Sequence, residues 1–260
     1  MKSKPLFFEA ENLSIAWVRA FLALMEPGVS RITPLVFTLT CISNGQPTET
    51  TVIRDELNIF LKQHGKSTIN STANTIFPKS FWNPNKDRRE LYDRYQRAFP
   101  VIKRLDSQNR YGLYFQRLIA FGQGRKRFPR EEVNQLEHII TTYKKGNHRS
   151  SALQASVLDP FLDHTDQRRR GFPCLQQISF VPDSETGELE ITGFYANQYI
   201  VERAYGNYLG LCRLGHFVAH EIGFSLSRMN CITNVAELGY PNKKDLMPLK
   251  RSVEEFTMEN

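Results

Sequence analysis

Hydrophobic residues recur every three or four positions along several stretches of the chain, which is the spacing of one helix face. The pattern predicts helices over 14–25, 53–63, 87–105, 130–143 and 199–221. Ser14 is a candidate cap for the first helix, which Pro27-Gly28 would end. Pro100 predicts a kink or a break in the third helix, because proline cannot donate the backbone hydrogen bond.

A strict alternation of apolar and polar residues predicts strands in other stretches. These cover 34–42, 174–181, 188–195 and 228–235. Between the second and the third, the turn-forming residues 182–187 predict a hairpin. Because helices and strands mix without a regular βαβ rhythm, we expect one α+β layered domain over 1–260. The loop-like stretches 66–86 and 159–171 are where we expect ligand contacts.

The composition is that of a soluble globular domain, with 40% hydrophobic and 23% charged residues. No apolar run approaches the ~20 residues needed to span a bilayer, and Glu9 comes too early for a secretory signal. Four scattered cysteines form neither a C-x-x-C pair nor a disulfide framework. We therefore expect a protein of the reducing cytoplasm that has no membrane partner.

A formal net charge of +7 is concentrated in basic clusters at 124–130, 144–149 and 168–170. Such clusters are either solvated loops or contacts to phosphate or nucleic acid, and both interpretations stay open. His216 and His220 have the spacing of two metal ligands on one helix face. No third ligand accompanies them in the sequence, so we expect no metal.

Cys174 begins the predicted strand 174–181, directly after Phe172-Pro173. The arginine run Arg168–Arg170 lies just before it, and nearby cations lower the pKa of a thiol and favour the nucleophilic thiolate. A lone cysteine is equally often a small buried apolar residue. Both interpretations stay open from this segment alone.

Taken in chain order, a series of segments resembles the landmarks of the thymidylate synthase family. The segment 54–61 (Arg-Asp-Glu-Leu-Asn-Ile-Phe-Leu) resembles the helix in which the family has His-Glu-Leu-Leu-Trp-Phe-Leu. Pro173-Cys174 matches the family's Pro-Cys, and Tyr205-Gly206-Asn207 matches its Pro-Phe-Asn. The other matching segments are 13–28, 34–40, 75–82, 110–115 and 148–150.

The resemblance implies a thymidylate-synthase-like layered fold, with a large mixed sheet and helices mainly on one face. It implies that the Cys174 thiolate adds to C6 of a uracil-type ring, which makes C5 nucleophilic enough to accept a one-carbon unit. Asn207 would hold the O4 and N3–H edge of uracil, although from the residue alone it could equally cap a helix. Glu56 would handle proton transfers through water, with a raised pKa.

The resemblance also implies a pyrimidine nucleotide as substrate, methylenetetrahydrofolate as a candidate cofactor and a homodimer with shared sites. In the family, an arginine at the place of Arg149 reaches the phosphate bound by the neighbouring subunit. The expected substrate-binding residues are Arg149, Ser150, Arg168, Arg169, Arg170, Trp82, Tyr111, Tyr195, Asn197 and Tyr199.

Several positions depart from the family's pattern. Where the family has Gln-Arg-Ser-x-Asp, with an arginine that stabilises the thiolate, residues 195–199 read Tyr-Ala-Asn-Gln-Tyr. The ribose-holding Gly-Asp-x-His-x-Tyr motif has no counterpart in 230–238, and 256–260 lacks the small apolar tail that closes over folate. We expect Arg168–Arg170 or Arg203 to supply the missing positive charge.

Two functions follow from these observations. The first is a divergent enzyme that uses Cys174 to modify C5 of a pyrimidine nucleotide, as a methyltransferase or hydroxymethylase would. The second is a catalytically altered or inactive homologue that binds a nucleotide or a nucleic acid. The retention of Cys174, Glu56 and Asn207 favours the enzyme, whereas the loss of the arginine and ribose motifs favours the binding protein.

Overall fold

A computed structural model describes residues 2–105, 109, 111–122, 133–166 and 172–258, and every structural statement below concerns these residues. The described chain forms a six-stranded mixed sheet with helices, which confirms the α+β class. In spatial order the strands are β1 (Lys2–Ala10), β2 (Val29–Leu39), β8 (Ser225–Glu237), β7 (Glu188–Tyr199), β6 (Leu175–Asp183) and β5 (Gln154–Ser156). The pairs β1–β2 and β7–β8 are parallel, and the other neighbouring pairs are antiparallel.

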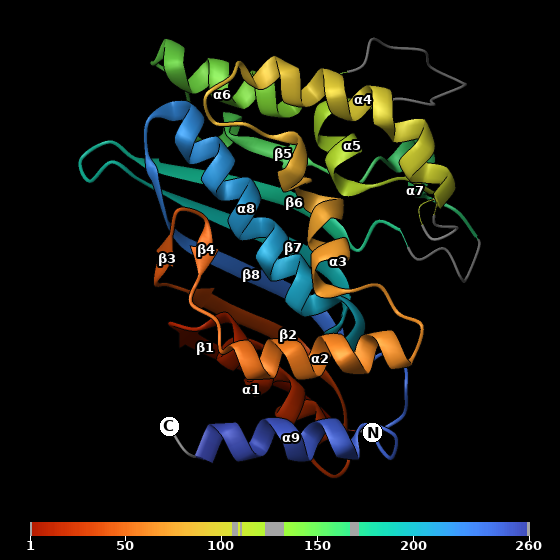
Figure 1. Ribbon diagram of the computed structural model, residues 1–260. Coiled ribbons are helices and arrows are strands. Elements are labelled where there is room, and N and C mark those ends of the chain that lie inside the picture. The colour runs from red at the N-terminus through yellow and green to blue at the C-terminus, as the bar shows by residue number, and fades with distance from the viewer. Residues whose placement is uncertain (1, 106–108, 110, 123–132, 167–171, 259–260) are drawn as a thin grey trace.

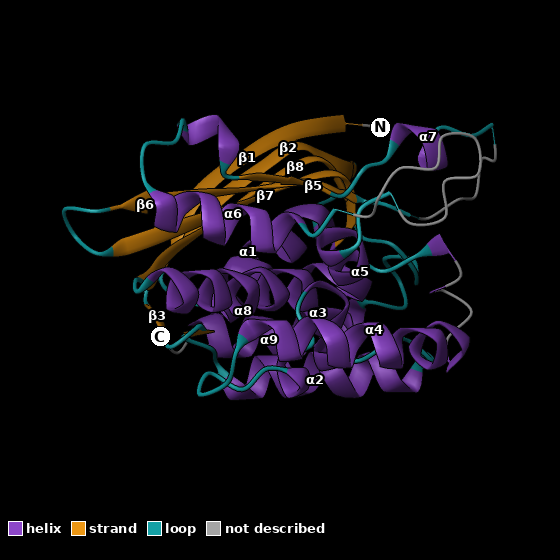
Figure 2. Ribbon diagram, turned by 90° about the horizontal axis from the view of Figure 1, so that it is seen from above, coloured by secondary structure: helices purple, strands orange, loops and turns teal. Residues whose placement is uncertain are grey.

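The helices lie on one side of this sheet (Figure 2). Those next to the sheet are α1 (Leu13–Met25), α6 (Gln135–Lys145) and α8 (Tyr205–Ile222). Beyond them lie α2 (Thr51–Gln63), α3 (Ile69–Ile76), α4 (Arg88–Leu105) and α9 (Met247–Met258). The short elements are α5 (Tyr114–Ile119), α7 (Pro160–Asp163) and a hairpin of β3 (Ile42–Ser43) and β4 (Gln46–Pro47).

The long helix α8 is the centre of the packing, because it lies between the sheet and α3 (Figure 1). Two glycines on α8 allow α3 to come close. A Cβ atom at Gly206 would lie 2.5 Å from the Thr72 Cβ, and one at Gly210 would lie 2.9 Å from the Ile76 Cβ. Nearly all of α8 is therefore buried, and its first turn is held rigidly against the core.

The opposite face of the sheet carries an apolar row that runs across four strands. Phe7 pairs with Val36, Val36 with Ile232, and Ile232 with Phe194. Phe7 and Phe194 are 64% and 40% exposed, because none of the described helices covers this face. The next row along the strands is polar, and in it the Thr38 hydroxyl donates to the Asn230 side chain at 2.8 Å.

Most of the predicted elements are confirmed, with differences at their ends. Asn12, and not Ser14, caps α1, since its side chain accepts from the backbone N–H of Ser14 and Ile15. Pro100 lies inside α4 without ending it. The predicted loop 66–86 was wrong in part, because it contains α3. Within the described residues, no helix is long and apolar enough to cross a membrane.

Candidate functional site

Cys174 lies one residue before β6, at the edge of its pairing with β7. Its carbonyl accepts a hydrogen bond from the backbone N–H of Ala196 at 2.9 Å. Ala196 is the position at which the resemblance would place an arginine, and the strand pairing puts this position beside Cys174. The thiol itself is half-buried.

The segment that leads into Cys174 is fixed by α5. The Tyr114 ring stacks on Phe172 at 5.3 Å between centroids, and the Arg117 guanidinium lies 5.3 Å from the centre of the Phe172 ring. Backbone hydrogen bonds from Cys174 and Leu175 reach the Tyr114 hydroxyl. Two side chains of one short helix thus set the position of the thiol.

A buried ion pair holds α5 in place. The Arg117 guanidinium lies 2.9 Å from the Asp163 carboxylate, and the two side chains are only 4% and 1% exposed. A buried pair of this kind fixes geometry because either charge alone would be costly to bury. None of Tyr114, Arg117 and Asp163 was predicted as a site residue. The sequence signals were the Tyr-Gly resemblance in 110–115, which includes Tyr114, and the loop-like stretch 159–171, which includes Asp163.

Two opposing effects act on the pKa of Cys174. Burial raises the pKa of the thiol, and this is the larger effect, while the positive charge of Arg203 lowers it. Arg203 lies in the π-helical turn Ile200–Ala204 that leads into α8. Within the described residues, desolvation of the thiol therefore outweighs the charge of Arg203. The arginines Arg168, Arg169 and Arg170 lie outside the described residues.

Three side chains near the end of β7 carry buried polar atoms without a partner. The Tyr195 hydroxyl, the Asn197 carbonyl oxygen and the Gln198 amide nitrogen are all buried, and none has a hydrogen-bond partner in the described chain. The Gln198 carbonyl oxygen, in contrast, accepts from Tyr208 at 2.9 Å and from Thr233 at 3.1 Å. An unsatisfied buried polar group costs ~1–3 kcal/mol. A polar ligand or ordered water beside the thiol would remove that cost.

Tyr195 and Tyr199 both interact electrostatically with Cys174. Burial is the main reason that the pKa of each phenol is raised, so both hydroxyls stay protonated near neutral pH. They can therefore donate hydrogen bonds but cannot serve as bases. Tyr111, which precedes α5, is half-buried.

Asn207 lies in the first turn of α8, four residues after Arg203, and is 3% exposed. The helix cap is not its role, because the π-helical turn runs directly into α8 and Ala204 is the residue before the helix. No hydrogen bond joins the Asn207 amide to another described residue. The amide is therefore available to a ligand that enters beside Arg203.

Glu56 and Trp82 lie on other elements than Cys174. Glu56 is half-buried on α2, and its carboxylate has no hydrogen bond or ion pair within the described chain. Trp82 packs against His216 and His220, near the end of α8. His220 follows Arg203 by 17 residues, which is ~25 Å along a helix axis. The described part of the chain shows no group of three His, Cys, Asp or Glu that could hold a metal.

Arg149 and Ser150 lie beside a cavity of about 740 Å³ at the far end of β6. Lys144, Lys145 and Ser150 line this cavity, and Phe180 contributes to its apolar wall. Phe180 follows Cys174 by six residues, which is ~20 Å along a strand. In one chain, the basic cavity and the thiol are therefore separate, as expected if Arg149 serves a neighbouring subunit.

A folate cofactor, which the resemblance implies, finds no matching closure in the C-terminal segment. The described chain ends in α9, whose Phe256 packs on the hydrophobic core. The helix lies along α1 and α2 (Figure 1). The folate cofactor stays an expectation of the resemblance, and we derive no step through folate.

Comparison with known protein families found no family model that matches the chain, and a search of curated proteins found no relative. The function is therefore inferred from the residues around Cys174 and from the order of the segments in the sequence.

Proposed function

We propose that this protein is a divergent enzyme with thymidylate-synthase-like layering, in which Cys174 adds to C6 of a uracil-type nucleotide and C5 is then modified. The observation that carries the proposal is the pairing of Cys174 with Ala196, together with the charge of Arg203. The family's arginine is missing from its usual place, and a cation from the turn before α8 acts on the same thiol. The position of Asn207, four residues after Arg203, supports the same assignment.

In the proposed addition, a bond forms between the Cys174 sulfur and C6. The electron pair of the C5–C6 double bond then moves toward O4, and C5 becomes the nucleophilic carbon. The Asn207 amide donates to O4 and so stabilises the charge that develops there. Because burial raises the pKa of the thiol, its proton leaves during the attack. Glu56, at the family's acid–base position, is the proposed acceptor through water.

The proposal includes a homodimer formed through the open face of the sheet. The apolar row Phe7, Val36, Ile232 and Phe194 supports this contact, since exposed aromatic and branched side chains are costly to leave in water. A dimer would also bring Arg149 from one subunit toward the other subunit's nucleotide. The remaining proposed ligand contacts are those of Tyr195, Asn197 and Tyr199, all on β7.

The second candidate is a nucleotide-binding or nucleic-acid-binding protein without catalysis. The raised pKa of Cys174 favours it, because a protonated, half-buried thiol is a poor nucleophile. The net charge of +7 is compatible with either ligand.

A thermal-shift panel separates the two functions. Mononucleotides of uracil and cytosine and short single-stranded oligonucleotides are each added, and the unfolding midpoint is measured at two salt concentrations. The enzyme predicts a saturable shift with the uracil nucleotide that exceeds the shift with its cytosine analogue. A response to oligonucleotides alone, which weakens steeply with salt, would replace the enzyme by the nucleic-acid-binding protein.

A further inference from the structure

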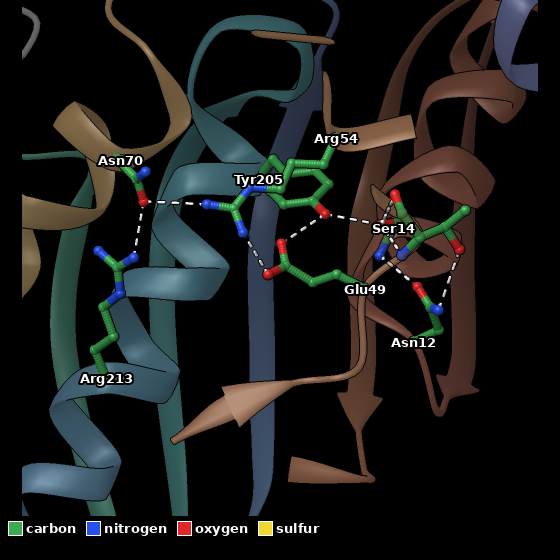
Figure 3. A network of polar contacts seen from close by, with 8 residues as sticks. Asn12, Ser14, Glu49, Arg54, Asn70, Tyr205 and Arg213 are labelled. Carbon is green, nitrogen blue, oxygen red and sulfur yellow. Dashed lines mark hydrogen bonds and ion pairs between the residues drawn. The ribbon is translucent and has the colours of Figure 1, made fainter. Parts of the chain in front are cut away.

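Two arginines from different helices converge on one uncharged acceptor, away from Cys174. Arg213 of α8 donates to the Asn70 side-chain carbonyl at 2.8 Å, and Arg54 of α2 donates to the same oxygen at 3.2 Å (Figure 3). Arg213 also reaches the Asn74 carbonyl at 3.4 Å. Two like charges therefore share a neutral amide on α3.

The nearby carboxylate of Glu49 already has two partners. Glu49 lies 2.6 Å from Arg54 and also accepts from the Tyr205 hydroxyl at 2.8 Å. Tyr205 in turn contacts Ser14, which ties Glu49 to the buried end of α1 (Figure 3). Glu49 is therefore the ion-pair partner of Arg54, and it acts on Arg213 only through its charge.

Arg213 has no ion pair in the described part of the chain, and its Nε is buried without a hydrogen-bond partner. Burial lowers the pKa of Arg213, and the charge of Arg54 lowers it further. Both effects mean that the folded protein holds this positive charge at a cost in free energy. A bound anion would offset that cost.

The surroundings of Arg213 supply further donors. Asn70 and Asn74 are exposed, and their amide nitrogens donate to none of the described residues. The planar guanidinium groups match the oxygens of a phosphate, and amide N–H groups complete such a site. The cluster therefore offers several donors to solvent, while its carboxylate is already neutralised.

We propose that Arg213, Arg54, Asn70 and Asn74 form an oxyanion site that binds a phosphate group. The site is distinct from the thiol, because Arg213 follows Arg203 by ten residues, or ~15 Å along the helix. The phosphate comes from a free nucleotide or from a polynucleotide, and the two sources share the chemistry that this site recognises.

The test is a titration with inorganic phosphate, in which the unfolding midpoint is followed at constant ionic strength against chloride. Arg213→Met removes the guanidinium but keeps an apolar stem, and Asn74→Ala removes an exposed amide. Arg97→Met is the matched control, since Arg97 is an exposed arginine of α4. Arg149→Met tests the basic cavity, and Cys174→Ser tests independence from the proposed reaction.

We expect a saturable rise of the midpoint in the wild-type protein and the same rise in Arg97→Met and Cys174→Ser, while Arg149→Met removes only the part of the response that the basic cavity contributes. Loss of a charged hydrogen-bonding group should weaken phosphate binding by about tenfold or more in Arg213→Met, and loss of a neutral one by about threefold in Asn74→Ala. If Arg213→Met does not fold, Asn74→Ala decides.

The proposal is overturned by any of three results. These are no saturable response in the wild-type protein, wild-type binding in Arg213→Met and Asn74→Ala, or loss of binding in Arg149→Met alone. A parallel titration with pyrophosphate and with a short oligonucleotide identifies the source of the phosphate. Tighter binding of either probe supports the site only if Asn74→Ala weakens that binding as well.

Discussion

At the scale of single residues, the chemistry of Cys174 is set by two neighbours that act in opposite directions. Burial against α5 and β7 disfavours the thiolate, and Arg203 favours it. The thiol is therefore protonated near neutral pH, although a cation is close enough to stabilise the thiolate once it forms. Removal of Arg203 should therefore change the pKa of the Cys174 thiol more than removal of any other described residue.

The pH dependence of alkylation measures this balance. Because burial raises the pKa of Cys174, its iodoacetamide reaction should reach half its maximal rate above the ~8.5 of a free cysteine. Arg203→Met should move that midpoint to higher pH, since the stabilising charge is gone. Exposed Cys41 is the internal control. Peptide mass mapping follows each cysteine, and equal reactivity of Cys174 and Cys41 at pH 7 would contradict the account.

At the scale of elements, the close contact between α8 and α3 fixes the helix that follows the turn carrying Arg203. Gly210 allows this contact, because a Cβ there would lie 2.9 Å from both the Ala73 carbonyl oxygen and the Ile76 Cβ. The helix cannot shift without moving the turn that carries Arg203.

Gly210→Ala should therefore destabilise the protein by about 1–3 kcal/mol through overpacking. The sign of the change in stability is informative, since alanine normally stabilises a helix interior relative to glycine by ~1 kcal/mol. Urea denaturation of the two proteins gives the difference in the free energy of unfolding. A gain of stability in Gly210→Ala would show that α3 and α8 are not tightly packed.

The sequence predicted the hairpin of β6 and β7 and the helix α8 well, because their periodicity is strong and their length is typical. It did not predict β1 or α9. In β1 the charged residues Lys2, Lys4 and Glu9 interrupt the apolar pattern, and other charged residues interrupt it in α9. The expected loop 66–86 contains α3, whose Thr72 and Ala73 are buried by contact with α8. Such burial depends on partners far along the chain, so local composition cannot show it.

The site was predictable only in part for the same reason. Cys174 and Asn207 stood out because they fall in short motifs, and Arg203 was one of two candidates for the missing charge. The fixing of the thiol by Tyr114, Arg117 and Asp163 depends on contacts between distant segments. The burial of the thiol could not be predicted, because the sequence shows which cations are near Cys174 but not how much water is excluded from it.

At the scale of the whole molecule, the open face of the sheet leaves an apolar row exposed, which the proposed dimer would cover. The proposed homodimer should have twice the chain mass in light scattering at micromolar concentration. Phe194→Lys should shift it to monomer, because a charge in the apolar row would be buried without a partner. Phe161→Lys is the control, since Phe161 is also exposed, at 65%, but lies on α7. A wild-type monomer would remove the shared site and the role of Arg149.

The central claim is that Cys174 is a nucleophile toward a pyrimidine ring, and mass spectrometry of the intact protein tests it most directly. A 5-fluoropyrimidine nucleotide favours the adduct, because the electron-withdrawing fluorine at C5 makes C6 more electrophilic toward the thiolate. The account predicts a mass gain of one nucleotide per chain in the wild-type protein and in Cys41→Ser, and none in Cys174→Ser. An unmodified wild-type protein, under conditions in which the same nucleotide raises the unfolding midpoint, would show that the thiol only packs and that the protein binds without catalysis.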